Sequence, residues 1–233
     1  MRAVTATGVS VSLGGRAVLE SVDVRLEAGS WLGVIGPNGS GKSTLLHALA
    51  GLVPLSGGAV SIGEAGLSGS QRKAWARLVA VVAQRPLIPP EMMVADYVLL
   101  GRTPHLGALA IEGPVDLAVV ANCLAQFDLT GMTERTLGTL SGGEVQRAIL
   151  ARAIAQETPV LLLDEPTTAL DLGHQQQVLE LVEDLRREKA LTVISALHDL
   201  TLAAQFCDQL LLLNNGRVVS EGSPVEVLTE EAI

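Results

Sequence analysis

The chain has 233 residues, of which 48% are hydrophobic and 18% charged, so it can bury a large core, and disorder is excluded as its main state. Sixteen basic against 25 acidic residues give a net charge of −9, which argues against nucleic acid or an anionic lipid surface as a direct partner. Two Phe, one Tyr and two Trp residues are too few for a base-stacking platform.

The two cysteines, Cys123 and Cys207, lie far apart and lack metal-binding spacing, which predicts a reduced, cytosolic compartment without a disulfide framework or structural zinc. The N-terminal residues contain no apolar signal core. No apolar run reaches the length of about 18 residues that predicts a membrane helix, so we expect any link to a membrane to come from a partner subunit.

The first predicted elements are strands. Apolar and polar residues alternate over 4–12 and 18–26, with a double glycine between them, which predicts an antiparallel pair. A short apolar strand over 31–35 is followed by a glycine-rich loop and by leucines at helical spacing, until Gly51 ends the helix. The order strand, loop, helix predicts the start of a parallel α/β sheet.

The same rhythm returns later in the chain. Strand-length apolar runs occupy residues 78–83, 160–163, 191–196 and 210–213, and a helical pattern covers 175–189. Asn214-Asn215-Gly216 predicts a hairpin turn. Residues 86–139 interrupt the rhythm with five prolines and short helical pieces, which indicates an inserted helical lobe. No linker is long enough to divide the chain into independent domains.

The glycine-rich loop matches the phosphate-loop pattern GxxxxGK[ST] between a strand and a helix. The residues expected to bind nucleotide phosphates are Gly36, Pro37, Asn38, Gly39, Ser40, Gly41, Lys42, Ser43 and Thr44. Backbone N–H groups and the helix start would attract phosphate, Lys42 would reach the β- and γ-phosphates, and Ser43 would bind Mg²⁺. A chance glycine-rich turn is the alternative, but the flanking strand and helix favour nucleotide binding.

A buried strand ends in two adjacent carboxylates, Asp164 and Glu165. Next to a phosphate loop, the first is expected to hold Mg²⁺ and the second to accept a proton from water. Taken alone, such a strand end is more often a solvated cap. The phosphate loop in the same chain makes the functional interpretation the favoured one.

A second helix also begins with small residues, in the run Ser141-Gly142-Gly143-Glu144. This start is either an ordinary N-cap or a second anion-binding helix terminus. One chain does not need two phosphate-binding helix starts for one nucleotide. The economical interpretation is that the second completes a site in another copy of the chain.

Three motifs in this order, GPNGSGKST, LSGGEVQRAILARAIA and VLLLDEPTTALD, resemble the nucleotide-binding subunit of ATP-binding cassette (ABC) transporters over essentially the whole chain. The resemblance implies a P-loop NTPase of α/β fold that forms one domain over 1–233. A RecA-like core with an antiparallel β subdomain would comprise about 1–85 and 159–233. A helical subdomain carrying the second motif would comprise about 86–158.

The resemblance also implies roles for three isolated residues. Gln84 matches the glutamine that senses magnesium and water, His198 the switch histidine at the γ-phosphate, and Asp171 the loop that bridges two protomers. Each residue is a weak signal alone. The assignment rests on the three residues occurring in the order that is typical of the family. The other histidines, His47, His105 and His174, are interpreted as helix or surface residues.

The implied mechanism is that of an ATPase working as a head-to-tail homodimer with two ATP molecules at the interface. Glu165 would polarise the attacking water, His198 and Lys42 would hold the γ-phosphate, and Ser43, Gln84 and Asp164 would arrange Mg²⁺. The run from Ser141 to Glu144 would cover the ATP of the partner protomer.

One position departs from the family pattern. An aromatic ring usually stacks on adenine about 16 residues ahead of the glycine that precedes the phosphate-loop strand, but that count leads to Leu13, and no aromatic residue precedes Trp31. Packing by Leu13 or guanidinium stacking by Arg16 could substitute. Arg16 is equally well interpreted as a solvated turn residue.

The segment after Gln84 indicates which partner the chain would have. Its apolar residues Leu87, Ile88, Met92, Met93 and Val94 form either a docking patch for a membrane partner or the core of the lobe. The runs DYVLLGRTPHLG, HQQQVLELV and LHDLTLAAQFCD resemble the ATPases of iron–siderophore, haem and cobalamin importers. That likeness implies permease subunits docking near 85–110, an extracytoplasmic binding protein, and a location at the cytoplasmic face of the membrane.

Two alternatives to transport stay open from the sequence. An assembly ATPase, such as the family member of iron–sulfur cluster assembly, would have soluble partners. A DNA-maintenance ATPase would usually carry a long coiled coil between the phosphate loop and the second motif, and this chain has none. The transported substrate cannot be read from this subunit, because the permease and the binding protein select it.

Overall fold

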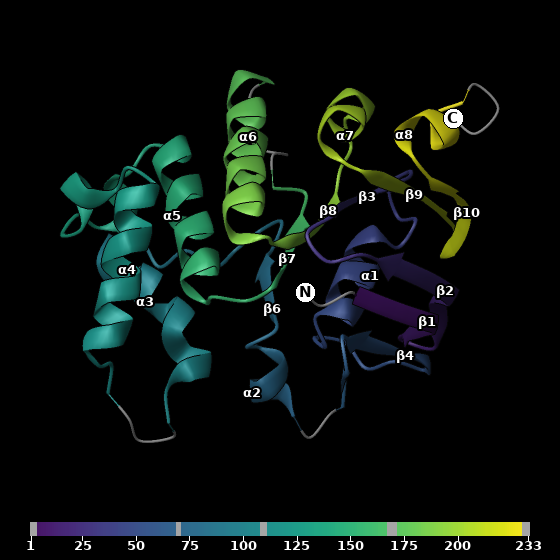
Figure 1. The fold of residues 1–233 in the computed structure, drawn as a ribbon, viewed down its shortest axis with the longest axis horizontal. Helices are drawn as coiled ribbons and strands as arrows, with labels where there is room; N and C mark the ends of the chain where they lie inside the picture. The colour runs from purple at the N-terminus through teal and green to yellow at the C-terminus, as the bar shows by residue number, and fades with distance from the viewer. Residues whose placement is uncertain (1–3, 69–70, 108–110, 167–171, 230–233) are drawn as a thin grey trace.

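The strands of the protein form two sheets, which differ in strand direction. The structure is a computed structural model, and it describes residues 4–68, 71–107, 111–166 and 172–229, without the side chains of Leu172 and His174. One sheet is antiparallel and the other mostly parallel, and helices cover the parallel sheet (Figure 1). The predicted α/β fold is confirmed.

The larger sheet has the strand order β10-β9-β3-β8-β7-β6 among the described residues. Its strands are β3 (Trp31–Ile35), β6 (Val79–Val82), β7 (Val160–Asp164), β8 (Thr192–Ala196), β9 (Gln209–Asn214) and β10 (Arg217–Gly222). All pairs are parallel except β9 with β10, which the predicted Asn214-Asn215-Gly216 turn joins. Every residue of β3, β7 and β8 is buried, as expected for parallel strands covered on both faces.

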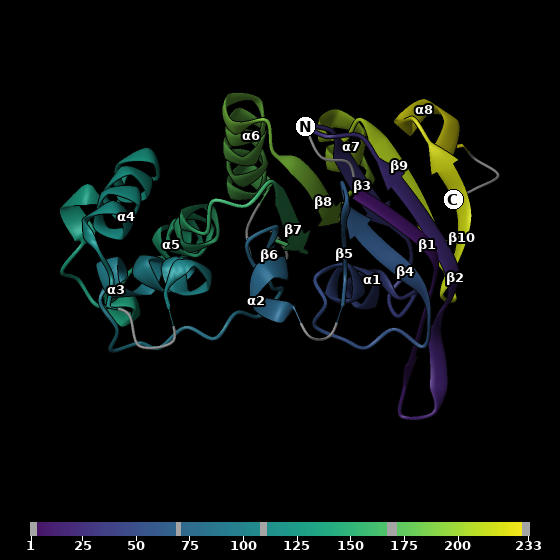
Figure 2. The same ribbon diagram turned by 60° about the horizontal axis from the view of Figure 1, so that its bottom comes forward.

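The smaller sheet lies beside the parallel one and has the order β2-β1-β4-β5 in the described chain. Its strands are β1 (Val4–Leu13), β2 (Arg16–Leu26), β4 (Gly57–Ile62) and β5 (Ala65–Gly66). Alternate residues of β1 and β2 pack with one face of the parallel sheet around α1 (Lys42–Leu49), in one hydrophobic cluster. The β1–β2 hairpin projects beyond the sheet as the purple ribbon in Figure 2.

The inserted lobe stands apart from the sheets, at the left of Figure 1. Its helices are α3 (Val94–Leu99), η1 (Leu100–His105), α4 (Pro114–Gln126), η2 (Thr130–Met132), η3 (Leu137–Thr139) and α5 (Gly142–Ala155). The remaining helices are α2 (Arg72–Trp75), α6 (Leu172–Lys189), α7 (Leu200–Phe206) and α8 (Pro224–Val227). The core of the lobe is continuous with the core on the other face of the parallel sheet.

The apolar residues that follow Gln84 divide between the two interpretations left open by the sequence. Val94 is fully buried, and Ile88 and Met92 pack partly buried against the core of the lobe. Leu87 and Met93 remain exposed, at 85% and 46%. The exposed patch is therefore smaller than the run of apolar residues, because Val94 at the start of α3 and the preceding Ile88 and Met92 pack against the core of the lobe.

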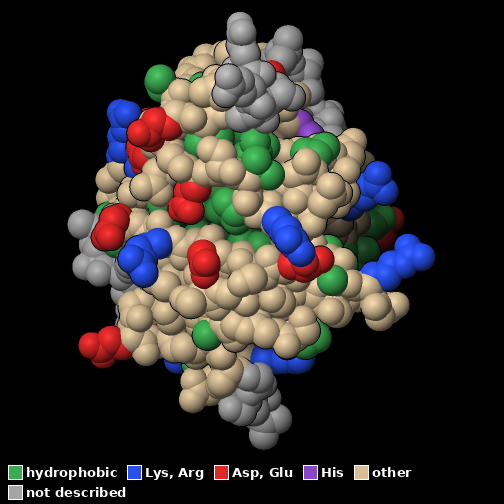
Figure 3. All heavy atoms as spheres, turned by 90° about the vertical axis from the view of Figure 1, so that its right-hand side faces the viewer, with side chains coloured by type: hydrophobic (Ala, Val, Ile, Leu, Met, Phe, Trp, Pro, Cys, Tyr) green, Lys and Arg blue, Asp and Glu red, His purple; other side chains and the backbone are tan. Residues whose placement is uncertain are grey.

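The surface of the described residues has two features that bear on possible partners. No helix in the described part of the chain is long and apolar enough to span a membrane. On the face formed by the C-terminal strands, basic and acidic side chains lie interspersed around apolar ones (Figure 3). That face therefore presents no single-sign surface of the kind that binds a nucleic-acid backbone.

Candidate functional site

The predicted site residues meet at one edge of the parallel sheet. Because β3, β8, β7 and β6 are adjacent and parallel, the segments that follow them emerge at the same edge. The glycine-rich loop follows β3, Glu165 follows β7, His198 follows β8 and Gln84 follows β6. The order of the strands thus brings together residues that are more than 150 positions apart.

The glycine-rich loop is held in shape by the neighbouring strand β9. Gly36 has a φ of 143° and Gly41 a φ of 107°, which residues with side chains rarely adopt. A Cβ atom on Gly36 would lie 2.0 Å from the carbonyl oxygen of Leu213. The N–H of Gly216 donates to the carbonyl of Ser40 over 2.9 Å. The loop conformation is therefore built by this chain alone, with Pro37, Asn38 and Gly39 exposed at its tip.

Lys42 folds back onto this loop at the start of α1. Its Nζ donates to the carbonyl oxygens of Gly36, at 2.8 Å, and Pro37, at 3.1 Å. Burial lowers the pKa of the Lys42 ammonium, while the charges of Glu165 and Asp164 raise it. Phosphate oxygens are anionic and therefore stronger acceptors than these two carbonyls. Lys42 Nζ lies where it could exchange the carbonyls for phosphate oxygens.

Asp164 lies at the buried end of β7, opposite the first turn of α1. The Ser43 hydroxyl donates to its Oδ1 over 2.8 Å, and burial raises the pKa of the carboxyl. His47 Nε2 lies 3.8 Å from Asp164 Oδ2. The interpretation of His47 as an ordinary helix residue missed this contact, although its position one helical turn after Ser43 was a usable signal.

Ser43 and Asp164 supply the kinds of donor that Mg²⁺ prefers, a hydroxyl and a carboxylate oxygen, on two rigid elements. Few protein oxygens are needed, because Mg²⁺ usually keeps several waters and binds phosphate oxygens. The residues therefore fit the ion that the resemblance implies. Gln84, the third expected ligand, has its amide turned toward Glu165 instead.

Glu165 is the centre of the second group of predicted residues. Its φ of 49° is unusual for a residue with a side chain, and its N–H donates to the carbonyl of Ala196 at the end of β8 over 3.3 Å. Gln84 Nε2 donates to its Oε2, and His198 Nε2 lies 2.5 Å from its Oε1. Three residues that the sequence assigned one by one thus meet at a single carboxylate.

The start of α5 is capped by its own residues. The Ser141 hydroxyl accepts from the Glu144 N–H over 3.4 Å, and Glu144 Oε2 accepts from the Ser141 N–H over 2.6 Å, which forms a capping box. The hydrogen bond from the Ser141 N–H lowers the pKa of Glu144. Both views place α5 in the lobe and α1 beneath the sheet, well apart (Figures 1 and 2). Within one chain, Ser141 and Gly143 do not complete the phosphate loop.

Leu13, Arg16 and Asp171 are predicted residues that lie outside these two groups. Leu13 and Arg16 are cross-strand partners at the tip of the β1–β2 hairpin, and both are exposed. Asp171 lies outside the described residues. The sequence did not predict that Gln146 of α5 donates from Nε2 to the carbonyl of Pro166, over 2.9 Å. This bond ties the lobe to the segment that follows Glu165.

Comparisons with known proteins show the family of the chain. The model of the family described as ABC transporter matches residues 19–168. The chain is 44% identical over 230 residues to the hemin import ATP-binding protein HmuV of Pseudomonas aeruginosa, covering 97% of this chain and 88% of that protein. It is 41% identical over 227 residues to the cobalamin import ATP-binding protein BtuD of Halobacterium salinarum. That match covers 97% of this chain but only 56% of the relative's length.

Among solved structures, the chain resembles a dimeric ATP-binding cassette in a post-hydrolysis state, bound to ADP and Pi. The TM-score is 0.81 and the identity 27%, over 95% of this chain and 98% of the other. Because the family model covers well over half of the sequence, the chain belongs to the ABC transporter family.

Proposed function

We propose that this chain is the ATP-hydrolysing subunit of an importer that takes up an iron–siderophore, haem or cobalamin. The observation that carries the proposal is the meeting of two groups at one sheet edge. Lys42, Ser43 and Asp164 form the first, and Gln84, Glu165 and His198 the second. A phosphate-binding loop beside a carboxylate held by two polar side chains suits the attack of water on a γ-phosphate.

ATP binding uses the exposed tip of the glycine-rich loop and the side chain of Lys42. On binding, the ammonium leaves the carbonyls of Gly36 and Pro37 and contacts the β- and γ-phosphates. Bound Mg²⁺ neutralises charge on the phosphate oxygens, and Ser43 and Asp164 would hold it. Backbone N–H groups of the loop and the start of α1 complete the anion site.

Hydrolysis uses the second group. Glu165 accepts a proton from the attacking water, and its fixed backbone at the end of β7 holds the carboxylate in place. His198 and Gln84 contact the two carboxylate oxygens of Glu165. We infer that water and phosphate displace these contacts when ATP binds, so that His198 turns to the γ-phosphate and Gln84 toward Mg²⁺.

The site is completed by a second copy of the chain. The start of α5 carries Ser141, Gly142, Gly143 and Glu144, lies in the lobe apart from α1 of its own chain, and has open space around Gly142. In a head-to-tail homodimer, this helix start covers the ATP of the partner, as an anion-binding terminus does. Asp171 is proposed to bridge the two protomers. The solved dimeric cassette supports this arrangement.

The partners follow from the relatives. Names that describe hemin and cobalamin import support a pair of permease subunits and an extracytoplasmic binding protein, with this chain at the cytoplasmic face of the membrane. The exposed side chains of Leu87 and Met93, next to Gln84, offer an apolar contact for the permease within 85–110. Closure on ATP and opening after hydrolysis would drive the permease.

The catalytic part of the proposal is tested with Glu165→Gln. The variant is expected to bind ATP and to lose at least about 10²-fold in turnover, the low end for removing a general base. It should also accumulate as a dimer with ATP and Mg²⁺, but not with ADP, in sedimentation velocity. Glu64→Gln, at an exposed carboxylate in the turn between β4 and β5, is the matched control and should turn over normally. Near-normal hydrolysis by Glu165→Gln would remove Glu165 from its proposed role.

The transport part is tested by purification from membranes. The tagged chain should co-purify with a polytopic membrane protein, and one of haem, cobalamin or a ferric siderophore should stimulate ATP hydrolysis in the reconstituted complex. Leu87→Glu should weaken the association without changing ATP affinity, because it puts a charge into an apolar contact. Co-purification with soluble partners alone would overturn the importer assignment.

A further inference from the structure

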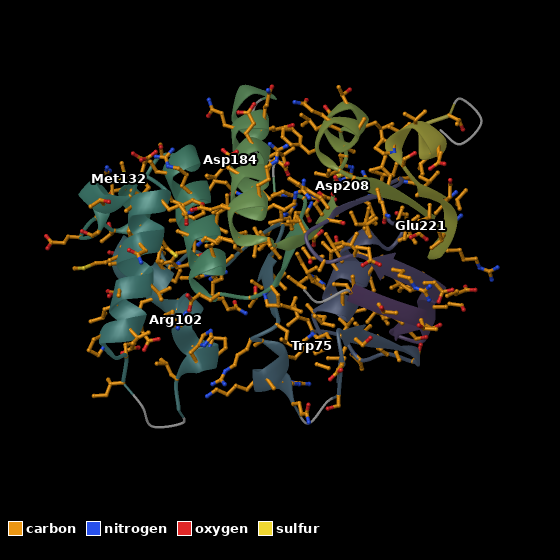
Figure 4. The ribbon with its side chains drawn as sticks, viewed as in Figure 1. Trp75, Arg102, Met132, Asp184, Asp208 and Glu221 are labelled. Carbon is orange, nitrogen blue, oxygen red and sulfur yellow. The ribbon has the colours of Figure 1, made fainter. Side chains whose placement is uncertain are left out.

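The motif Gly101-Arg102-Thr103-Pro104-His105 lies outside both groups of the proposed ATP site, yet it carries a buried cation. The Arg102 side chain is 4% exposed and lies among the lower ends of the lobe helices (Figure 4). Its Nε donates to Asp116 Oδ1 over 2.9 Å. Its Nη1 donates to the carbonyl of Ala155 and to Glu157 Oε2, each over 2.7 Å. A buried arginine with this many partners holds the segments that supply them.

Those partners come from two segments that are distant in the sequence. Asp116 lies in the first turn of α4, where its other carboxylate oxygen accepts from the Gly113 N–H over 3.0 Å. Ala155 is the last residue of α5, and Glu157 lies in the short connection from α5 to β7. Arg102 therefore joins the start of one lobe helix, the end of another and the strand connection that leads to Asp164.

The backbone around Arg102 is also closely packed. A Cβ atom on Gly101 would lie 2.2 Å from the carbonyl oxygen of Arg152, so η1 approaches α5 at backbone distance. His105 Nε2 lies 2.8 Å from the carbonyl oxygen of Gln156. The interpretation of His105 as a plain surface residue missed this contact.

The same place connects the lobe to the sheet. Gln156 Nε2 donates to the carbonyls of Ala76, over 2.5 Å, and Val79, over 2.9 Å, at the start of β6. Arg77 Nε donates to the carbonyl of Pro104 over 2.8 Å, and Lys73 Nζ donates to the carbonyl of Leu106. We call the group Arg102, His105, Asp116, Gln156 and Glu157 the Arg102 junction.

The elements held by the junction carry the proposed catalytic residues at their other ends. Helix α5 ends at the junction and begins next to Ser141, β7 ends at Asp164, and β6 leads to Gln84. Helix α5 has 14 residues and is therefore about 21 Å long. A tilt of about 5° at the junction would move its start by about 2 Å, and misplacement of about 1 Å can cost about 10²-fold in rate.

We propose that Arg102 is a positioning residue, which fixes the angle of α5 to the parallel sheet so that Ser141 of one copy reaches the ATP of the other. The inference rests on the proposed head-to-tail dimer. Arg102 touches no nucleotide in this arrangement and acts through the segments that it holds at the end of α5. Its loss should therefore weaken ATP-driven dimerisation and leave nucleotide binding by the single chain unchanged.

The test uses Arg102→Met in the full chain, with and without Glu165→Gln. ATP-driven dimerisation of the double variant, measured by sedimentation, should weaken at least about tenfold, within the usual range for coupling between sites. The ATP affinity of the single chain should stay within about twofold of the parent. Arg217→Met is the matched control, because Arg217 makes an exposed ion pair with Glu20. Equal dimerisation of Arg102→Met and its parent would overturn the proposal.

Two milder variants keep the test decisive if Arg102→Met fails to fold. Arg102→Lys keeps the charge, but its single nitrogen cannot reach three acceptors at once, so dimerisation should fall between those of the parent and Arg102→Met. Gln156→Leu removes the bonds to the start of β6 and should reproduce the dimerisation defect with Arg102 intact. Parent-like dimerisation of both variants would contradict the inference.

A distance measurement separates this inference from the proposed function. Spin labels at the exposed positions Leu117 of α4 and Leu52 beyond α1 report the lobe and the core, and both native cysteines are buried. In nucleotide-free protein, the distance distribution should be broader in Arg102→Met than in the parent, and unchanged in Arg217→Met. If the parent never dimerises with ATP, the proposed function fails, and this measurement still decides whether Arg102 fixes the angle between the lobe and the core. A distance distribution that is unchanged in Arg102→Met would refute this role.

Discussion

The two glycine-rich helix starts of this chain, at α1 and at α5, look alike in sequence and are built differently. At α1, Gly36 and Gly41 adopt positive φ angles, β9 packs against the loop, and Lys42 is buried on the loop carbonyls. At α5, a Cβ atom on Gly142 would meet nothing within 4 Å, and Ser141 and Glu144 cap each other. The first start is enclosed by its own chain, and the second faces outward.

This difference suits the proposed use of two helix starts, one from each copy of the chain, for one nucleotide. Glycine at α1 is needed because the backbone conformation and the contact with Leu213 exclude a side chain. Glycine at α5 leaves space in front of the helix start, which suits a surface that another molecule must approach. Defects at α1 should therefore appear in the single chain, and defects at α5 only in the dimer.

The largest expected effect comes from making the same substitution at both starts. Gly36→Ala should destabilise the fold by at least about 2 kcal/mol, because the new methyl group collides with the carbonyl of Leu213. Gly142→Ala should be neutral or stabilising by up to about 1 kcal/mol, since alanine favours a helix and the space is open. Urea unfolding of the nucleotide-free chain measures both. Equal destabilisation would remove the contrast between the two starts.

The next largest effect concerns ATP binding at the start of α1 alone. Lys42→Met should weaken ATP binding by the single chain about 10- to 100-fold, because a charge-assisted hydrogen bond to phosphate is lost. Ser141→Ala should leave that affinity unchanged and weaken only ATP-driven dimerisation. Titration calorimetry of the single chain, followed by sedimentation, separates the two. A loss of single-chain affinity in Ser141→Ala would place both helix starts in one site.

A smaller effect concerns stability and pH at α1. Burial raises the pKa of Asp164, so the folded chain binds its proton more tightly than the unfolded chain does. The free energy of unfolding therefore falls as the pH rises from the pKa of Asp164 in the unfolded chain to its pKa in the folded chain. At neutral pH, the ionised Asp164 carboxylate destabilises the nucleotide-free protein. Asp164→Asn should add about 1 kcal/mol at pH 7, a typical size for one such site. The gain should shrink as the pH falls toward the unfolded pKa of about 3.9.

Asp184→Asn is the control for this pH series, because Asp184 is an exposed carboxylate on α6 (Figure 4). Denaturant unfolding at several pH values measures both variants. A gain of Asp164→Asn that is independent of pH would show that its cause is packing rather than the buried charge.

The smallest expected effect lies at the hairpin tip. If the Arg16 guanidinium stacks on adenine, Arg16→Ala should weaken ATP binding about two- to fivefold, the scale of an exposed cation–π contact. Tripolyphosphate binding should not change. Unchanged ATP affinity would exclude the arginine and leave the phosphate contacts of α1 dominant.

Much of the fold could be predicted because it depends on local patterns. The alternating residues of the first hairpin, the apolar runs of β7 and β8 and the Asn-Asn-Gly turn each follow from side-chain period or turn chemistry. The sequence left open whether the apolar residues after Gln84 form an exposed patch or the core of the lobe, because an apolar run does not say which of its residues pack inward. The contacts of His47 and His105 depend on partners more than 50 positions away.

By itself, the sequence determined the chemistry of this protein: a phosphate loop, paired carboxylates and a capped helix start, each recognisable from neighbouring residues. Only the tertiary structure decided how they meet, since the strand order puts Gln84 and His198 on the same carboxylate and keeps Ser141 away from Lys42 in one chain. The acidic balance of the composition argued against nucleic acid or an anionic lipid surface as a partner, and the proposed anion site uses backbone N–H groups instead. Local patterns follow from short-range sterics and periodicity. The contacts of Gln84 and His198 with Glu165 instead follow from strand pairing over long sequence distances.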